Sequence, residues 1–317
     1  MGIGSRAAFV LVIAGAIASA CTSLDGLAGG EEPAFDDGGR PAKDAGGRSE
    51  GGVPADGGPV TPGSRCDAAK PFEAPVLVTE FDPQADFVKG AVMSNDEREA
   101  FYLRYDGARS DWILRHARRS SPDAAWDAIT DETIAPTPDA YLSLTAGGLK
   151  LYFWTIDSNY KATRASTADA FGTPAKFDVA SGPGAHLVDA DDTAYFSRYE
   201  GDAAIVGRIR RGTVTSYGFS TGSTYVPNVW VDGASDSRPV LNRSETAMYF
   251  SSNRPGGRGL ADVWVSHRPT KQDEFGPGIH VRELSTDEFD AVTWVSDDEC
   301  VVLLDRASHV YRARRPK

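Results

Sequence analysis

An all-β fold is predicted for residues 71–317 from three features of the sequence. Short runs rich in Val, Tyr, Phe and Trp alternate with Gly, Asp, Asn and Pro, which favours strands joined by tight turns. No segment of this region shows the 3.6-residue periodicity of a long helix. A polar turn followed by an aromatic or apolar pair also recurs along the chain, and such recurrence indicates a repeat architecture.

The recurring turn and its strand set the number of units. The copies end at residues 102, 153, 196, 250 and 304, so the steps are 51, 43, 54 and 54 residues. Five copies at this spacing indicate five similar units. Their segments are SNDEREAFY (94–102), TAGGLKLYF (145–153), VDADDTAYF (188–196), NRSETAMYF (242–250) and SDDECVVLL (296–304).

Each unit supplies further strands around this central one. An apolar strand precedes each turn, in the order GAVM, AYLSL, AHLV, RPVL and AVTWV. Another strand follows each aromatic one, in the order DWILRHA, YKATRAS, AIVGRIR, DVWVSHR and HVYRARR. With one outer strand, each unit has four antiparallel strands, which predicts a five-bladed β-propeller.

The two ends of the repeat region predict how the ring closes. The segment FEAPVLVTEF (72–81) resembles FGPGIHVREL (275–284), the outermost strand of the fourth unit, whereas the fifth unit ends without such a strand. We therefore expect the N-terminal strand to complete the last blade, which removes an exposed sheet edge. This would bring Cys66 near Cys300. In an exported protein these two cysteines could form a disulfide, and the alternative is two buried thiols.

The fourth unit carries a family resemblance. Its SSNRPGGRGLADVWVSHR (251–268), preceded by LNRSETAMYF, resembles the TolB-like β-propeller repeat of bacterial envelope proteins. In that repeat a polar turn, an aromatic strand, Ser-Asn-Arg, a glycine loop and Asp-Ile-Trp follow in order. The resemblance covers residues 71–317 and implies recognition of an envelope partner such as a peptidoglycan-associated lipoprotein. TolB has six blades, so a six-bladed ring is the alternative to the five counted here.

The first 20 residues predict export. Arg6 supplies the positive charge of a signal-peptide n-region, and the apolar run from Ala7 to Ala18 is too short for a membrane-spanning helix. The run ends in Ala-Ser-Ala before Cys21, which resembles the lipobox of bacterial lipoproteins and predicts a lipid on Cys21. Ordinary signal cleavage, giving a secreted soluble protein, is the alternative. Thr22, which follows the cysteine, favours the outer membrane, on either its periplasmic or its surface side.

Residues 21–70 are predicted to be a lipid-anchored, disordered tether. Gly, Pro and Asp dominate this segment and large apolar residues are almost absent. Such a composition buries too little surface to offset the entropy of ordering the chain. The net charge of −12 excludes nucleic acid as an expected partner, because phosphate binding needs a basic face. We expect no cofactor, no metal site and a monomeric protein.

A binding surface is predicted where the second strand of each blade meets the third, because propellers bind on the face around the axis. Arginines and aromatic residues gather at these positions, and they suit a carboxylate, a glycan or an acidic protein surface. The alternative is that each arginine pairs with a local carboxylate such as Asp106, Asp157, Glu200 or Asp262. The predicted binding residues are Arg104, Tyr105, Trp154, Arg198, Tyr199, Arg254, Arg258 and Arg306.

Three aspartates stand six residues before the aligned turns, at positions that lead into the innermost strands: Asp139, Asp236 and Asp290. Carboxylates converging near the axis could hold a cation or act as the acid and base of a glycoside hydrolase. The alternative is that they cap loop backbone, as Asp often does in turns. The sequence favours a non-catalytic binding module for a protein or cell-wall partner, with a carbohydrate-active hydrolase as the alternative.

Overall fold

The structure is a computed structural model that describes residues 65–81, 87–145, 147–155, 158–177, 185–187, 193–200, 206–215, 218–219 and 223–317. The segments expected to be the signal peptide, the lipidated Cys21 and the tether as far as residue 64 lie outside the described residues. Among the described residues, no helix is both long and apolar enough to cross a bilayer. Their single helical element is the 3-10 turn η1 (Arg282–Leu284).

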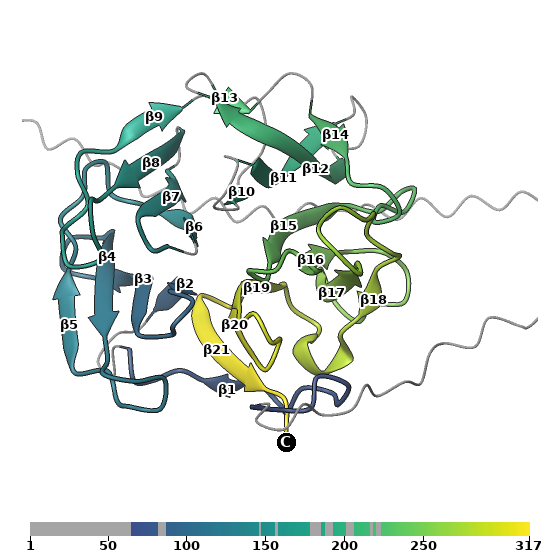
Figure 1. Ribbon diagram of the computed structural model, residues 1–317, viewed down its shortest axis with the longest axis horizontal. Coiled ribbons are helices and arrows are strands. Elements are labelled where there is room, and N and C mark those ends of the chain that lie inside the picture. The colour runs from purple at the N-terminus through teal and green to yellow at the C-terminus, as the bar shows by residue number, and fades with distance from the viewer. Residues whose placement is uncertain are drawn as a thin grey trace, which may run out of the picture. The chain divides into compact units, whose positions relative to one another are not determined.

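The described strands form five antiparallel sheets, one for each predicted repeat unit (Figure 1). Blade one contains β2 (Val88–Met93), β3 (Glu99–Asp106), β4 (Asp111–Arg118) and β5 (Ala128–Asp131). Blade two contains β6 (Ala140–Leu144), β7 (Lys150–Trp154), β8 (Asn159–Thr163) and β9 (Ala175–Phe177). In blade three, β10 (Ala185–Leu187) and β11 (Thr193–Glu200) precede β12 (Val206–Thr215), which pairs with both β13 (Gly218–Phe219) and β14 (Thr224–Tyr225).

The last two blades show how the ring is completed. Blade four contains β15 (Asp236–Leu241), β16 (Ala247–Ser252), β17 (Asp262–His267) and β18 (Ile279–His280). Blade five contains β19 (Asp290–Val295), β20 (Val301–Arg306), β21 (His309–Arg314) and the N-terminal β1 (Val76–Leu77). The innermost strands β2, β6, β10, β15 and β19 contact one another in turn, and β19 contacts β2. The ring is therefore closed with five blades, as predicted, and the six-bladed alternative is wrong.

The recurring aromatic pair has a packing role. Successive residues of a strand point to opposite faces of the sheet. Accordingly, Phe101 joins the apolar cluster between blades one and two, whereas Tyr102 joins the cluster between blades five and one. Tyr249 and Phe250 divide in the same way between the two sides of blade four. Each pair therefore binds its blade to both neighbours, which explains why the pattern recurs once in each unit.

The predicted closure by the N-terminal strand is confirmed. Val76 and Leu77 of β1 pair with Arg312 and Tyr311 of β21. The chain then crosses from blade five to blade one, where the ring of Phe81 stacks on that of Tyr102 at 4.7 Å. The hydroxyl of Tyr102 donates a hydrogen bond to the carbonyl oxygen of Phe81 (2.6 Å). Strand β1 and the residues that follow it thus hold the last blade against the first.

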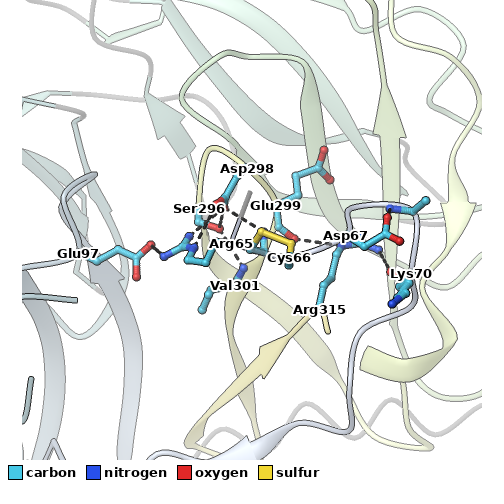
Figure 2. The surroundings of a disulfide bond; sticks show 12 residues. Arg65, Cys66, Asp67, Lys70, Glu97, Ser296, Asp298, Glu299, Val301 and Arg315 are labelled. Atoms are coloured by element: carbon cyan, nitrogen blue, oxygen red, sulfur yellow. Dashed lines mark hydrogen bonds and ion pairs between the residues drawn. A yellow bond between two sulfur atoms is a disulfide. The ribbon is translucent and has the colours of Figure 1, made fainter. Parts of the chain in front are cut away.

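A disulfide joins Cys66, in the segment that precedes β1, to Cys300 of blade five (Figure 2). Both cysteines are buried, and their Cα atoms lie 5.6 Å apart. The adjacent Arg65 forms ion pairs with Asp298 of blade five (2.8 Å) and with Glu97 of blade one (Figure 2). The expectation that the disordered tether continues to residue 70 is therefore wrong for residues 65–70, because these bonds fix them to the propeller.

Replacing both Cys66 and Cys300 with Ser is expected to lower the free energy of unfolding by about 2–4 kcal/mol. The disulfide joins residues separated by 234 positions, so its loss allows the unfolded chain many more conformations. Urea unfolding of the oxidised protein and of the double variant measures the difference. A reductant should destabilise the wild type and leave the variant unchanged. Equal stability of the two oxidised proteins would contradict a role for the disulfide in closing the ring.

Candidate functional site

Loops between the second and third strands lie beside the segments that lead into the innermost strands. The N–H of Tyr105 donates to the carbonyl of Phe87 (3.1 Å), and that of Asp139 donates to the carbonyl of Trp154 (3.2 Å). Ala261 likewise forms a parallel bridge with Phe289. We call the surface that these segments share the loop face. It comprises Phe87 and residues 105–110, 230–235, 253–261, 285–289 and 307–308.

Arg254 does not act as an exposed binding residue on this face, so that prediction is wrong. Its side chain is only 4% exposed. Its Nη2 donates to Oδ1 of Asp236 (2.7 Å) and to the carbonyl of Val229 (2.7 Å). The guanidinium also lies over the rings of Phe250 and Trp264, at 4.8 and 5.0 Å from their centroids. Arg254 is a structural residue inside blade four.

Two of the three axial aspartates are partners of predicted binding arginines. Asp236 and Asp290 are fully buried, with exposed fractions of 0%. Burial raises the pKa of Asp236, and the charge of Arg254 opposes that rise. Asp290 accepts a hydrogen bond from Nε of Arg306 through Oδ1. The arginines and the carboxylates, predicted as two separate sets, therefore neutralise each other within single blades.

The capping alternative is correct for Asp290. Its Oδ2 accepts hydrogen bonds from the backbone N–H (2.6 Å) and the hydroxyl (2.8 Å) of Thr286. Both oxygens of Asp290 are therefore occupied by the protein. The hydrolase hypothesis needs two accessible carboxylates that flank a substrate. Asp236 and Asp290 are buried and bonded within the protein, so they do not meet this requirement of the hydrolase alternative.

The glycine-rich loop of blade four is built around Asp262. Oδ2 of Asp262 accepts hydrogen bonds from the N–H groups of Arg258 (2.7 Å) and Gly259 (3.2 Å). A Cβ atom on Gly257 would lie 2.1 Å from that same oxygen, so the loop requires a residue without a side chain there. Of the three loop glycines, only Gly256 has a positive φ (96°). Arg258 itself remains exposed, and its Nη1 donates to the carbonyl of Ser285 (3.3 Å).

The other predicted binding residues stand at strand ends next to the loop face. Arg104, Trp154 and Arg198 are half-buried at or near the ends of β3, β7 and β11. Tyr105 is also half-buried and packs edge-on against Trp112 (5.4 Å between centroids). The side chain of Tyr199 lies outside the described part of the structure. Asp139 is half-buried just before β6.

Large apolar side chains are exposed on the loop face, and sequence reasoning missed them. Leu260 is 70% exposed, Phe87 41% and Phe289 36%. Trp230 and Val231 are also exposed in the segment that leads into β15. Leu260 and Phe289 each interrupt an otherwise polar loop, GGRGLAD and STDEFD. A large apolar residue inside a polar loop is the signal that could have identified them.

Arg238 contacts aromatic side chains at the centre of the propeller. Nη2 of Arg238, on β15, donates to the hydroxyl of Tyr141 on β6 (2.8 Å). The guanidinium of Arg238 lies over the rings of Tyr141 (4.5 Å) and Phe289 (4.6 Å). Because blades two and four are not neighbours, this contact crosses the ring centre. Arg238 and Tyr141 have positive φ angles of 52° and 51°, at matching irregularities of their innermost strands.

Asp305 extends this central cluster from blade five to blade one. Both of its carboxylate oxygens accept from the N–H of Gly90, each at 2.9 Å. Burial raises the pKa of Asp305 to about 6, although the Gly90 N–H and the charges of Arg238 and Lys89 oppose the rise. Burial also lowers the pKa of Lys89, whose Nζ lies 3.7 Å from the ring centroid of Trp112. Within the described residues, no group of three His, Cys, Asp or Glu could hold a metal ion.

Comparisons with known proteins yield matches among solved structures. No protein-family model matches the sequence, and no curated protein is significantly similar to it. TolB from Acinetobacter baumannii is 13% identical, with a TM-score of 0.44 over 72% of this chain and 54% of that one. A putative TolB from Agrobacterium tumefaciens is 12% identical, with a TM-score of 0.41 over 74% of this chain and 70% of that one.

An enzyme is found among the similar structures as well. A puromycin hydrolase is 13% identical, with a TM-score of 0.42 over 76% of this chain and 40% of that one. The chain thus spans about half the length of the first TolB and less of the hydrolase. The propeller fold itself rests on the strand order and ring closure described above.

Proposed function

We propose that this chain is an exported, lipid-anchored protein of the bacterial outer membrane whose propeller binds a protein partner through the loop face. The signal-like first 20 residues and Cys21 support export and lipidation. The Cys66–Cys300 disulfide fits an oxidising compartment outside the cytoplasm. The tether would give the propeller reach from the membrane.

The exposed apolar residues of the loop face carry the proposal for binding. Phe87, Leu260 and Phe289 leave much of their apolar surface in water, although burial of such side chains is favourable by about 1.5–3 kcal/mol each. Aromatic residues and arginine are enriched at the buried centres of protein interfaces. Arg238 lies against Phe289, so a cation and an exposed ring meet at the centre of this face. The set suits a protein partner with an apolar patch and a nearby carboxylate.

A triple variant tests this function. Phe87→Ser, Leu260→Ser and Phe289→Ser together are expected to weaken partner binding by about a hundredfold or more, because interface anchors of this kind contribute about 1–2 kcal/mol each. The full chain and the variant are first used to co-purify proteins from an envelope extract. Affinity for the recovered partner is then measured by titration, and thermal unfolding confirms that the variant is folded.

The matched control removes exposed apolar residues from other surfaces. Ile279 on the outer strand of blade four and Leu149 in the turn before β7 are both exposed. Ile279→Ser with Leu149→Ser should leave the affinity unchanged. Equal retention of the partner by the triple variant would refute the loop-face proposal. If the chain instead sediments with purified peptidoglycan sacculi and captures no protein, its partner is a cell-wall component.

A further inference from the structure

A second surface feature lies on the opposite face of the propeller, where the first and second strands of each blade are joined. It is a cavity of about 690 Å³, a volume suited to a small ligand. The turns of blades one, two and four contribute to its wall, together with the ends of β4 and the loop after β8. It shares no lining residue with the loop face.

Arginines dominate the charged residues of this cavity, although the whole chain is acidic. The lining contains Arg98, Arg118, Arg119 and Arg243, against two carboxylates, Asp96 and Glu99. The chain as a whole carries a net charge of −12. Four guanidinium groups around one cavity therefore concentrate positive charge at a single place on this protein.

The four arginines are held to different degrees. Arg118 donates from Nε to Glu99 (3.1 Å) and from Nη2 to the carbonyl of Thr167 (2.8 Å). Arg119 is buried, and its Nε donates to the carbonyl of Glu97 (2.6 Å). Within the described part of the chain, no carboxylate pairs with Arg98 or Arg243, and both side chains are exposed. Two of the four cations are thus available to a ligand.

Both carboxylates of the cavity lining, Asp96 and Glu99, already accept hydrogen bonds from other groups of the protein. Oε2 of Glu99 accepts from Nη2 of the buried Arg164 (2.6 Å), which lies behind the cavity wall. Oδ1 of Asp96 accepts from the hydroxyl of Ser94 (2.6 Å) and from the N–H of Arg98 (3.2 Å), which closes the turn. Arg164 balances the charge of Glu99, and among the described lining residues Asp96 is the one carboxylate left against Arg98 and Arg243.

Two further arginines, Arg312 and Arg314, are among the charges that act on Arg119. Burial lowers the pKa of Arg119, and the nearby positive charges of Arg312 and Arg314 add to the effect although Glu97 opposes it. Glu97 also binds Arg65 (Figure 2), so its charge is shared between two arginines.

We propose that this cavity binds a small anion with two or more carboxylate or phosphate groups, held by the exposed Arg98 and Arg243. Guanidinium groups donate paired hydrogen bonds that match the oxygens of both kinds of anion. Arg98 and Arg243 belong to the turns of two different blades, so a ligand with more than one charged group can engage both.

Calorimetric titration of the full chain tests the site with two probes, pyrophosphate and citrate, at constant ionic strength. Saturable binding of one molecule per chain is expected for at least one probe. Binding of pyrophosphate alone would assign phosphate ligands, binding of citrate alone would assign carboxylate ligands, and mutual competition would assign both. Arg98→Gln with Arg243→Gln should weaken binding by about tenfold or more.

A matched variant separates a built site from general charge attraction. Arg109 and Arg282 are exposed arginines outside the cavity, so Arg109→Gln with Arg282→Gln removes the same charge elsewhere. This control should bind the probe with unchanged affinity. The proposal fails if neither probe binds, if Arg98→Gln with Arg243→Gln binds as tightly as the wild type, or if both double variants lose affinity equally. None of these outcomes depends on the partner of the loop face.

Discussion

Asp236→Asn is expected to lower the free energy of unfolding by about 3–5 kcal/mol, the usual consequence of removing one partner from a buried ion pair. The side chain of Asp236 is fully buried, and that of Arg254 is 4% exposed. After the substitution, Arg254 keeps its full charge inside blade four. Its remaining partners are the hydroxyl of Ser252 and the carbonyl of Val229, and both are neutral. Urea unfolding followed by tryptophan fluorescence measures the loss.

Two further variants show whether the ion pair is the cause. Asp287→Asn removes an exposed carboxylate from the same face and should change stability by less than about 0.5 kcal/mol. Asp236→Asn with Arg254→Met removes both charges, so part of the lost stability should return. If Asp236→Asn were as stable as Asp287→Asn, the assignment of Arg254 as a structural residue would be wrong.

The architecture could be predicted because it repeats. Phe101 and Tyr102 illustrate the reason: an adjacent pair of large side chains fills the space on both sides of a blade, so each blade requires its own pair. Five pairs therefore indicate five blades. Closure by the N-terminal strand followed from the likeness of residues 72–81 to residues 275–284, a comparison that needs no knowledge of the fold.

The candidate site was less predictable because it depends on register and on depth within a blade. Asp236 and Arg254 are 18 positions apart in the sequence, and neither residue indicates that the other is its partner. They meet because Asp236 pairs with Ser252 across the hairpin, in a register that is shifted between Ser237 and Val240. A sequence pattern places both residues near the axis but does not distinguish a buried arginine from an exposed one.

The arginine cavity was also difficult to predict, because its residues are even farther apart in the sequence. Arg98, Gly148 and Arg243 belong to the turns of three different blades, and only ring closure brings these turns to one cavity. No short motif contains them. Two of the turn sequences that revealed the repeat lie at these arginines: NRSE contains Arg243, and SNDE immediately precedes Arg98. Because these turns recur along the chain, the sequence indicates a structural role for them and not a binding role.

Glu99→Gln should also cause a large loss of stability, and this loss should depend on pH. Glu99 accepts from the buried Arg164 (2.6 Å), from His116 (3.1 Å) and from Arg118 (3.1 Å). Burial alone would raise the pKa of Glu99, but these three donors outweigh it and hold the pKa at about 2. A carboxyl group whose pKa is lowered by folding stabilises the folded state above its ordinary pKa. The lowering corresponds to roughly 3 kcal/mol at neutral pH.

The pH profile identifies this carboxylate as the source of the effect. Between pH 7 and pH 5 the free energy of unfolding of the wild type should exceed that of Glu99→Gln by a nearly constant margin. The margin should then shrink as the pH falls from about 4.5 towards 2, because Glu99 becomes protonated in the wild type as well. His116 acts in the opposite direction. Burial lowers the pKa of His116, but its bonds to Glu132 and Glu99 raise it overall, so its contribution is present at low pH and declines at high pH.

A surface pair on the same sheet provides the control for this variant. Arg115 on β4 pairs with Asp131 on β5, but the side chain of Asp131 is 53% exposed. Water screens such a pair, so Asp131→Asn should cost less than about 1 kcal/mol and show little dependence on pH. A margin for Glu99→Gln that stays constant down to pH 3, or that is no larger than that for Asp131→Asn, would contradict the assignment. The contrast follows from burial and from the number of donors, because Glu99 accepts from three side chains whereas the exposed Asp131 pairs with one arginine.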